Sequence, residues 1–85
     1  MITAWQLRAA RALAGVDQRQ LAEQSGLSVP TIQRMEASNG LVRGNVDSLN
    51  KIIIALNKAG VELIDEGVTS PTGGRGVRLK LANSA

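Results

Sequence analysis

The chain has 85 residues, of which 44% are hydrophobic and one is aromatic, and its formal net charge is +3. This length supports one domain, whose core must be built from aliphatic side chains. Cysteine and histidine are both absent, which excludes disulfide bonds, thiolate or imidazole metal sites and histidine-based catalysis. No apolar run approaches the roughly 18 residues of a membrane span, and no secretory signal is evident. We therefore expect a cytoplasmic protein without metal or cofactor.

The first helix is predicted to begin at Thr3 and to end at Gly15. Thr3 and Gln6 have the spacing of a capping box, in which each side chain bonds the backbone N–H of the other residue. Gly15 stands where a left-handed residue closes a helix. The apolar positions expected to point into the core are Leu7, Ala10, Leu13 and Ala14.

Residues 17–36 predict two short helices joined by a tight turn. Asp17 caps the first of them and Gly26 ends it, and Ser28 caps a second helix over residues 28–37. Two helices this short, meeting at a sharp corner, form a helix-turn-helix. This motif usually presents its second helix to the major groove of DNA.

A loop over residues 38–45 is followed by a fourth predicted helix, from the cap Asn45 to about Ala59. Its core stripe is expected to be Val46, Leu49, Ile53 and Leu56, with Ile52 on the flank. Ile54 falls on the opposite side, among charged residues. It is either a tolerated surface isoleucine or a residue covered by the C-terminal segment or by a second subunit.

After the fourth helix the hydrophobic period changes from helical to alternating, and residues 61–66 and 77–81 predict two strands. Glu62 on the first strand would face Arg78 and Lys80 on the second. A lone two-stranded hairpin is marginally stable in water. These strands must therefore pack on the helices, pair with another chain, or both.

The predicted fold is mainly α. Residues 1–60 form a bundle of four helices that contains the helix-turn-helix, and residues 61–85 form a C-terminal β-hairpin in the same compact unit. The hairpin is a candidate dimerisation or partner-binding element.

The outward face of the helix over residues 28–37 carries side chains suited to reading bases. Ile32 and Met35 are expected to point toward the first two helices, which leaves the opposite face free. Glutamine can grip adenine, and arginine guanine, through two hydrogen bonds, and apolar groups can touch a thymine methyl. An ordinary solvated face is the alternative, although the preceding turn favours DNA. The predicted base contacts are Val29, Pro30, Gln33 and Arg34.

Phosphate contacts are predicted near the starts of the helices and in the loop before the fourth one, because free N–H groups and the helix dipole favour anions. For Arg19 a solvated first turn is an equally good interpretation, and Asn45 serves first as a helix cap. The predicted phosphate contacts are Gln18, Arg19, Ser28, Thr31, Arg43 and Asn45.

Glu36 ends the predicted recognition helix, where an acid is unfavourable both for the helix dipole and beside DNA. An arginine partner would explain its presence, and Arg11 on the first helix is our candidate. We interpret both residues as a structural ion pair.

Together these residues resemble the Xre-like family of helix-turn-helix regulators, the phage-repressor and Cro type, over roughly residues 3–61. The matching positions are Leu7, Arg11, residues 17–22 and 26–28, Thr31, Ile32, Arg34, Met35 and Glu36. The resemblance implies a lambda-repressor-like fold and a dimer that binds a palindrome in double-stranded DNA. It implies a phosphate contact for Gln18, base-facing positions for Val29, Pro30, Gln33 and Arg34, and the Arg11–Glu36 ion pair. Two departures are Pro30, where a small polar residue is common, and the strands that replace a fifth helix.

We expect a transcriptional regulator, a repressor, that binds double-stranded DNA as a homodimer through the helix over residues 28–37. The alternative is an antitoxin or adaptor that binds a protein partner through its C-terminal strands, whose edges can extend another sheet. An enzyme is not expected, because the chain has no SxxK spacing, no phosphate loop and no paired carboxylates. RNA is disfavoured by the lack of stacking aromatics.

Overall fold

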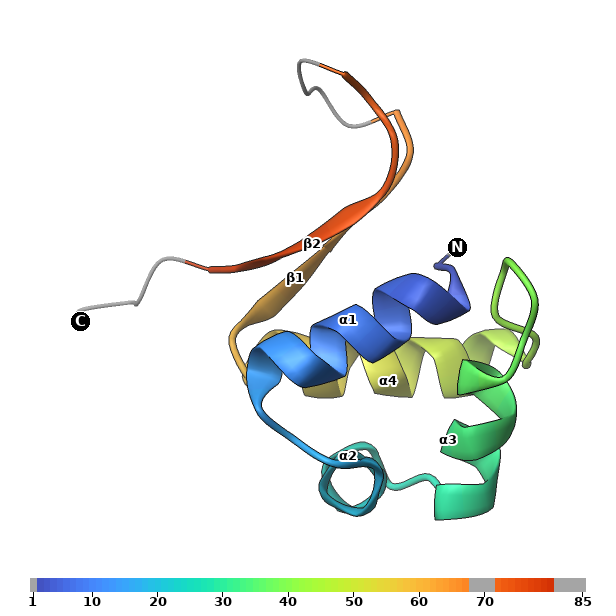
Figure 1. Ribbon diagram of the computed structural model, residues 1–85. Helices are drawn as coiled ribbons and strands as arrows, with labels where there is room; N and C mark the ends of the chain where they lie inside the picture. The colour runs from blue at the N-terminus through green and yellow to red at the C-terminus, as the bar shows by residue number, and fades with distance from the viewer. Residues whose placement is uncertain (1, 68–71, 81–85) are drawn as a thin grey trace.

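The computed structural model describes residues 2–67 and 72–80, whose arrangement is shown in Figure 1. Helices are followed by a two-stranded antiparallel sheet, which confirms the mainly helical fold with a C-terminal hairpin. The helices are α1 (Ala4–Ala14), α2 (Gln18–Ser25), α3 (Val29–Glu36) and α4 (Val46–Lys58), and the strands are β1 (Val61–Ile64) and β2 (Gly76–Leu79).

The first two helices both begin with a capping box, and the one formed by Thr3 and Gln6 is the one predicted above. In α1, the Gln6 N–H donates to Thr3 Oγ1 at 3.1 Å and the Thr3 N–H donates to Gln6 Oε1 at 2.9 Å. In α2, the Gln20 N–H donates to Asp17 Oδ1 at 2.8 Å, and the reciprocal bond measures 2.9 Å. Gly26 ends α2 with φ at 76°, which a side chain would strain, and so permits the sharp turn into α3.

The core lies between the helices and beneath β1, and it is aliphatic. Its largest fully buried side chains are Leu7, Leu21, Ile32, Met35, Ile52, Leu56 and Val61. The prediction that Leu13 points inward is wrong, because this side chain is 38% exposed. At 100° per residue, Leu13 lies about 120° around α1 from the buried Leu7, outside the stripe that the other elements cover.

The core face of α4 is rotated from the predicted one. Ile52, expected on the flank, is fully buried, whereas Val46, expected in the core, is 72% exposed. The helix turns the side of Ile52 and Ala55 toward α2, α1 and β1, so Val46 at its start is left at the margin. Ile54 is 54% exposed within the part of the chain that the structure describes.

The two strands pair with each other within one chain and are shorter than predicted. Val61 pairs with Leu79 and Ile64 pairs with Gly76, so β1 ends before residues 65–66 and β2 begins one residue before the predicted range. Residues 68–71 of the connecting loop and Leu81 of the predicted second strand lie outside the described residues.

The expected charge pairing across the hairpin is present for one of the two cations. Glu62 lies opposite Arg78, and Arg78 Nη2 is 3.0 Å from Glu62 Oε2. Lys80 is tied to α4 instead, because its Nζ donates to Asn57 Oδ1 at 2.7 Å. Its N–H donates to the carbonyl oxygen of Gly60 at 2.8 Å, which extends the hairpin pairing by one residue on each side.

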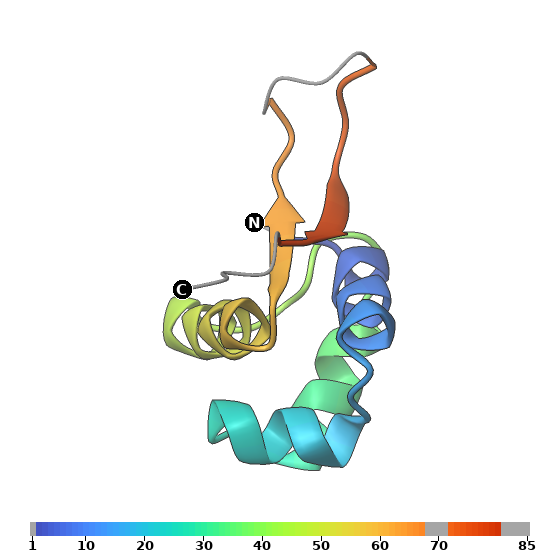
Figure 2. The same cartoon turned by 90° about the vertical axis from the view of Figure 1, so that its left-hand side faces the viewer.

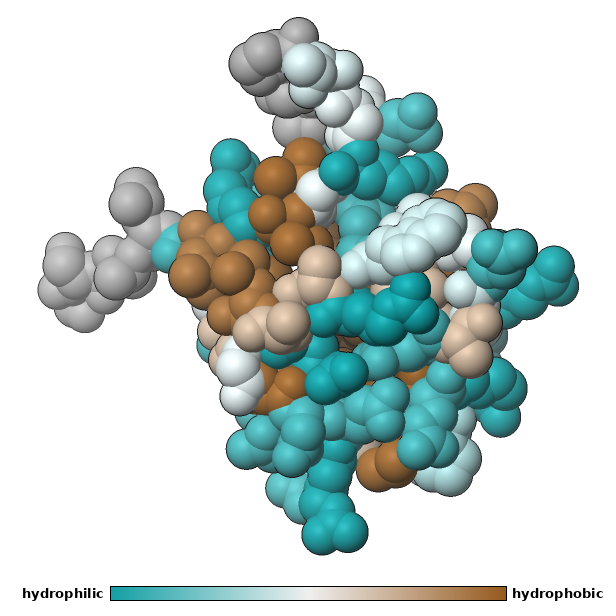
Figure 3. Space-filling model, in the orientation of Figure 1, coloured by the Kyte–Doolittle hydropathy of each residue, from teal (hydrophilic) through white to brown (hydrophobic). Residues whose placement is uncertain are grey.

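The hairpin packs on α1 and α4 at the opposite end of the molecule from α2. Figures 1 and 2 both show the strands above α1 and α4, with α2 below them. Val61 belongs to the core, at 1% exposure, so the hairpin is part of the same hydrophobic unit as the helices. In Figure 3 hydrophobic atoms gather over the hairpin, while the end that carries α2 and α3 is mostly hydrophilic.

Candidate nucleic-acid interface

Helix α3 has one buried and one exposed face, as the sequence predicts. Ile32 and Met35 are 0% and 1% exposed and pack into the core. On the other side three of the four predicted base contacts are exposed, and the fourth, Val29, is half-buried at the edge. The exposed contacts are Pro30, Gln33 and Arg34. The face therefore offers an amide and a guanidinium, and each of these groups can form two hydrogen bonds to one base edge.

The start of α3 holds two of the predicted phosphate contacts close together. Ser28 Oγ accepts a hydrogen bond from the Thr31 N–H at 3.2 Å, which caps the helix. The hydroxyls of Ser28 and Thr31 are 2.9 Å apart and share one hydrogen bond. One hydroxyl hydrogen of the pair is left to donate elsewhere, because each bond uses a single hydrogen.

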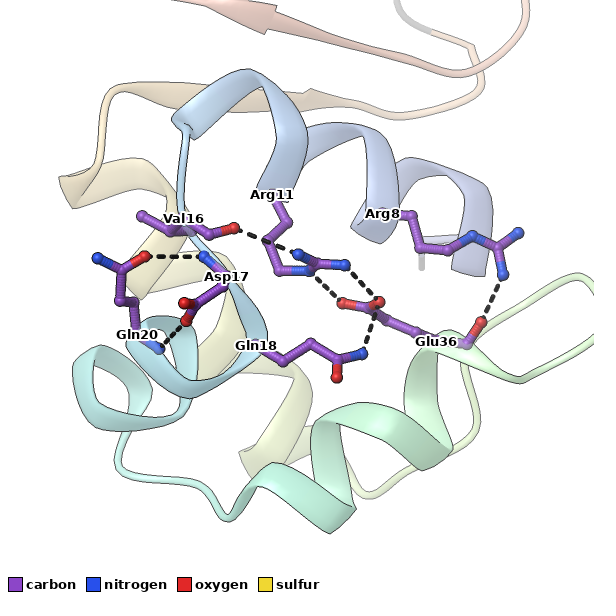
Figure 4. Close-up of polar contacts among 7 residues, drawn as sticks. All are labelled: Arg8, Arg11, Val16, Asp17, Gln18, Gln20 and Glu36. Atoms are coloured by element: carbon purple, nitrogen blue, oxygen red, sulfur yellow. Dashed lines mark hydrogen bonds and ion pairs between the residues drawn. The ribbon is translucent and has the colours of Figure 1, made fainter.

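A network centred on the Glu36 carboxylate holds α3 against α1 and α2, as Figure 4 shows. Glu36 is 5% exposed, and Arg11 grips both of its oxygens, with Nε 2.8 Å from Oε2 and Nη2 3.1 Å from Oε1. This forked geometry gives a strong, directional ion pair. The contact expected between these two residues is thus present, and it places a buried acid at the end of α3.

The Glu36 carboxylate further favours the protonated form of Arg11. Its hydrogen bonds to the guanidinium raise the pKa of Arg11 above the ordinary value, and its negative charge acts in the same direction, against the effect of burial. A raised pKa means that the stabilisation is complete below the unfolded-state pKa and is lost only as the pH rises through the folded-state value. Arg11 therefore stays protonated except in strongly alkaline solution.

Gln18, a predicted phosphate contact, is oriented by the same carboxylate. Its Nε2 donates to Glu36 Oε1 at 3.0 Å (Figure 4), which uses one of the two amide hydrogens. The second hydrogen is available to an anion, as is the backbone N–H in the first turn of α2. Arg19 next to it is exposed.

Arg8 is an additional member of this network that the sequence reasoning missed. Its Nη1 donates to the carbonyl oxygen of Glu36 at 2.7 Å, so it satisfies a backbone group at the C-terminal end of α3. A cation there also complements the helix dipole. The available signal was its position three residues before Arg11, which puts both side chains on one face of α1.

The loop after α3 carries Arg43 and Asn45, the last two predicted phosphate contacts. Ser38 Oγ donates to the carbonyl oxygen of Arg34 at 3.4 Å and accepts from the Arg43 N–H at 3.3 Å, which ties the loop to the end of α3. Asn45 caps α4, because its Oδ1 accepts from the Ser48 N–H at 2.7 Å. The side chains of Arg43 and Asn45 are both exposed.

The described part of the chain was also searched for metal-binding clusters and for membrane-spanning helices. Within residues 2–67 and 72–80, no group of three or more carboxylate, histidine or cysteine side chains could hold a metal ion. None of the helices described is long and apolar enough to cross a bilayer.

Comparison with known proteins agrees with this geometry. A family profile described as a helix-turn-helix domain matches residues 4–49, which include α1, α2, α3 and the start of α4. A search among curated proteins gave no match. The match covers more than half of the chain and includes the exposed face of α3 and the Glu36 network. The chain therefore belongs to the helix-turn-helix family of DNA-binding domains.

Proposed function

We propose that the protein is a transcriptional regulator that recognises a specific sequence in double-stranded DNA with α3 in the major groove. The observation that carries the proposal is the two-sided character of α3. Ile32 and Met35 hold one side in the core while Gln33 and Arg34 stand exposed on the other. To read the major groove, a protein must hold side chains that can form two hydrogen bonds to a base in a fixed orientation.

Phosphate contacts would set the orientation of α3 on the duplex. Gln18, held by Glu36, lies on one side of the recognition helix, and Arg43, held through Ser38, lies at its end. Contacts to the backbone on both sides of a groove fix the register of the helix without reading sequence. The surface of α2 and α3 is also largely hydrophilic (Figure 3), as a DNA-facing surface needs to be.

We further propose that the protein acts as a repressor. Occupying an operator is enough to block transcription, whereas activation needs an additional productive contact with the polymerase. The assignment can be tested by placing the selected site within or beside a promoter in a reporter, where binding should lower expression.

The central test is a selection of binding sites from a pool of randomised duplexes with the purified full chain. We expect one motif with two inverted half-sites to be enriched, and its affinity to fall steeply as salt is raised. Binding that depends on salt but enriches no motif would reduce the function to non-specific DNA binding. The absence of binding at low salt would reject a DNA-binding role.

A second candidate function is binding of a protein partner through the hairpin, as in an antitoxin or adaptor. The observation in its favour is Leu79, which is 57% exposed on β2 at the end of the molecule opposite α2. A partner there would leave the DNA-facing side open. If a partner acts there, Leu79→Asp should change regulation in the reporter while DNA affinity in vitro stays the same. Unchanged regulation would remove this candidate.

A further inference from the structure

Asn39 is the one asparagine of the sequence that precedes a glycine, and it lies in the α3–α4 loop, residues 37–45. Its side chain is exposed and forms no hydrogen bond with another described residue. The N–H of Gly40 also has no acceptor within the part of the chain that the structure describes. The side-chain amide of Asn39 and the backbone nitrogen that follows it are therefore both available for reaction.

The chemistry that joins these two groups is the closure of a five-membered ring. Gly40 has no side chain to obstruct it, the space beside its α-carbon is open, and its φ of 90° is a conformation that glycine adopts freely. The Gly40 nitrogen bonds to the side-chain carbonyl carbon of Asn39, and its proton departs with the amide nitrogen as ammonia. Water then opens the resulting succinimide at either carbonyl, which gives aspartate or isoaspartate at position 39. The reaction therefore needs water alone as a co-reactant.

The other described asparagines do not have this combination of features. Asn45 is held as a helix cap, since its Oδ1 accepts from the Ser48 N–H at 2.7 Å, and a branched valine follows it. Asn50 and Asn57 lie within α4 and each precedes a lysine, and in a helix the next backbone N–H belongs to the hydrogen-bond ladder. Ring closure is therefore opposed at these three positions and open at Asn39.

We propose that Asn39 is a site of spontaneous deamidation, which places a negative charge in the α3–α4 loop. One new carboxylate lowers the formal net charge from +3 to +2. Asn39 and Arg43 line the same open depression, so the new carboxylate lies on the surface that carries the Arg43 guanidinium. A carboxylate there competes with a phosphate for this cation and repels the duplex backbone.

The isoaspartate product also lengthens the main chain where the loop is held on both sides. Before Asn39, Ser38 Oγ accepts from the Arg43 N–H at 3.3 Å. After it, the carbonyl oxygen of Gly40 accepts from the Ala4 N–H at 2.9 Å. One extra methylene between these two contacts cannot be accommodated unless one of them moves. The modification therefore disturbs the position of Arg43 as well as its charge environment.

The consequence for DNA binding rests on the proposed function. Arg43 and Asn45, two of the predicted phosphate contacts, lie in the same loop as Asn39. Phosphate contacts supply much of the affinity for any duplex, so their loss weakens binding to preferred and other sequences alike. Deamidation would then set a chemical lifetime for tight DNA binding by each molecule.

The first experiment follows the modification itself, in the full chain without DNA. Purified protein is kept in mildly alkaline buffer at physiological temperature, and samples taken over time are digested with trypsin and analysed by mass spectrometry. Cleavage after arginine and lysine gives a peptide over residues 35–43, in which Asn39 is the only asparagine. Peptides over residues 44–51 and 52–58 carry the other described asparagines and serve as internal controls.

We expect aspartyl and isoaspartyl forms of the peptide over residues 35–43 to accumulate before either control peptide changes. Asn39→Gln is the matched variant, because it keeps the amide but would need a less favourable six-membered ring. This variant should stay unmodified over the same time. An unchanged wild-type peptide, or equal rates in all three peptides, would overturn the proposal.

The second experiment measures affinity for the selected duplex. Asn39→Asp carries the new charge without the longer main chain and should weaken binding about three- to tenfold. Aged wild type should lose at least as much, whereas Asn39→Gln aged in the same way should lose nothing. Full affinity in a wild type that mass spectrometry shows to be modified would overturn the effect on DNA. Fresh protein that binds no duplex would reject the proposed function, and the peptide analysis would still decide whether Asn39 is modified.

Discussion

Gln6 Nε2 donates to the carbonyl oxygen of Ile64 at 3.0 Å, across 58 positions of the chain. The same nitrogen donates to the carbonyl oxygen of Gly76 at 3.1 Å, while Gln6 Oε1 accepts from the Thr3 N–H. One buried side chain thus caps α1 and holds both strands of the hairpin where their pairing ends. The start of the first helix and the last two strands are therefore coupled.

Replacing Gln6 with alanine should loosen the hairpin as well as the helix start. Gln20 is the matched control, because it fills the same capping-box role in α2 and is exposed. We expect Gln6→Ala to lower the free energy of unfolding by about 1–3 kcal/mol more than Gln20→Ala, since two strand carbonyls lose a donor. Urea unfolding measures the difference, and amide exchange should quicken in β1 and β2. Equal losses in the two variants would contradict the coupling.

Arg11→Ala should strongly destabilise the fold, because it leaves the buried Glu36 carboxylate without its cation. We expect a loss of about 3–5 kcal/mol in the free energy of unfolding. Arg78→Ala breaks an exposed ion pair with Glu62 and should cost no more than about 1 kcal/mol. Chemical denaturation of the two variants gives the comparison, and similar costs would show that the Glu36 network contributes little.

The rotation of α4 predicts opposite outcomes for two neighbouring isoleucines. Ile52→Ala opens a cavity in the core and should cost about 2–5 kcal/mol in the free energy of unfolding. Ile54→Ala, on the exposed side, should change it by no more than about 0.5 kcal/mol. Urea unfolding at low protein concentration avoids any effect of dimerisation. A large loss at Ile54 would mean that the helix faces the core differently.

Gln33→Ala should relax the preference for one base pair within the selected site. We expect a loss of about 1–3 kcal/mol in binding free energy on the preferred duplex and little loss on the duplex changed at that position. Gln24→Ala provides a control, because this glutamine is also exposed but lies in the last turn of α2. Fluorescence anisotropy across single-base variants is the measurement. A uniform loss on every duplex would argue against base reading.

Arg43→Ala should weaken binding to all duplexes alike. If Arg43 neutralises one phosphate, the slope of log affinity against log salt should fall by about one. Arg78→Ala removes the same charge from β2 of the hairpin, outside α2, α3 and the loop that follows α3, and should leave the slope unchanged. A change in base preference with Arg43→Ala would instead place its side chain in a groove.

Short-range signals in the chain were enough to predict the helices and the outward face of α3. Capping boxes, glycine stops and the 3.6-residue period act over three or four residues, so Thr3, Asp17 and Gly26 mark their boundaries before any packing exists. The outward face of α3 follows from the same periodicity. The Arg11–Glu36 contact could be anticipated because an acid at a helix end demands a cation.

Tertiary packing decided the features that local sequence signals do not specify. The rotation of α4 that buries Ile52 and exposes Val46 depends on which neighbours cover the helix, and a stripe of apolar residues alone admits either choice. The links from Gln6 to β1 and β2, and from Arg8 to α3, join residues far apart in the chain, where no local period operates. Whether the strands pair within one chain was likewise settled by the surface that α1 and α4 offer, because a hairpin of this size needs a hydrophobic support.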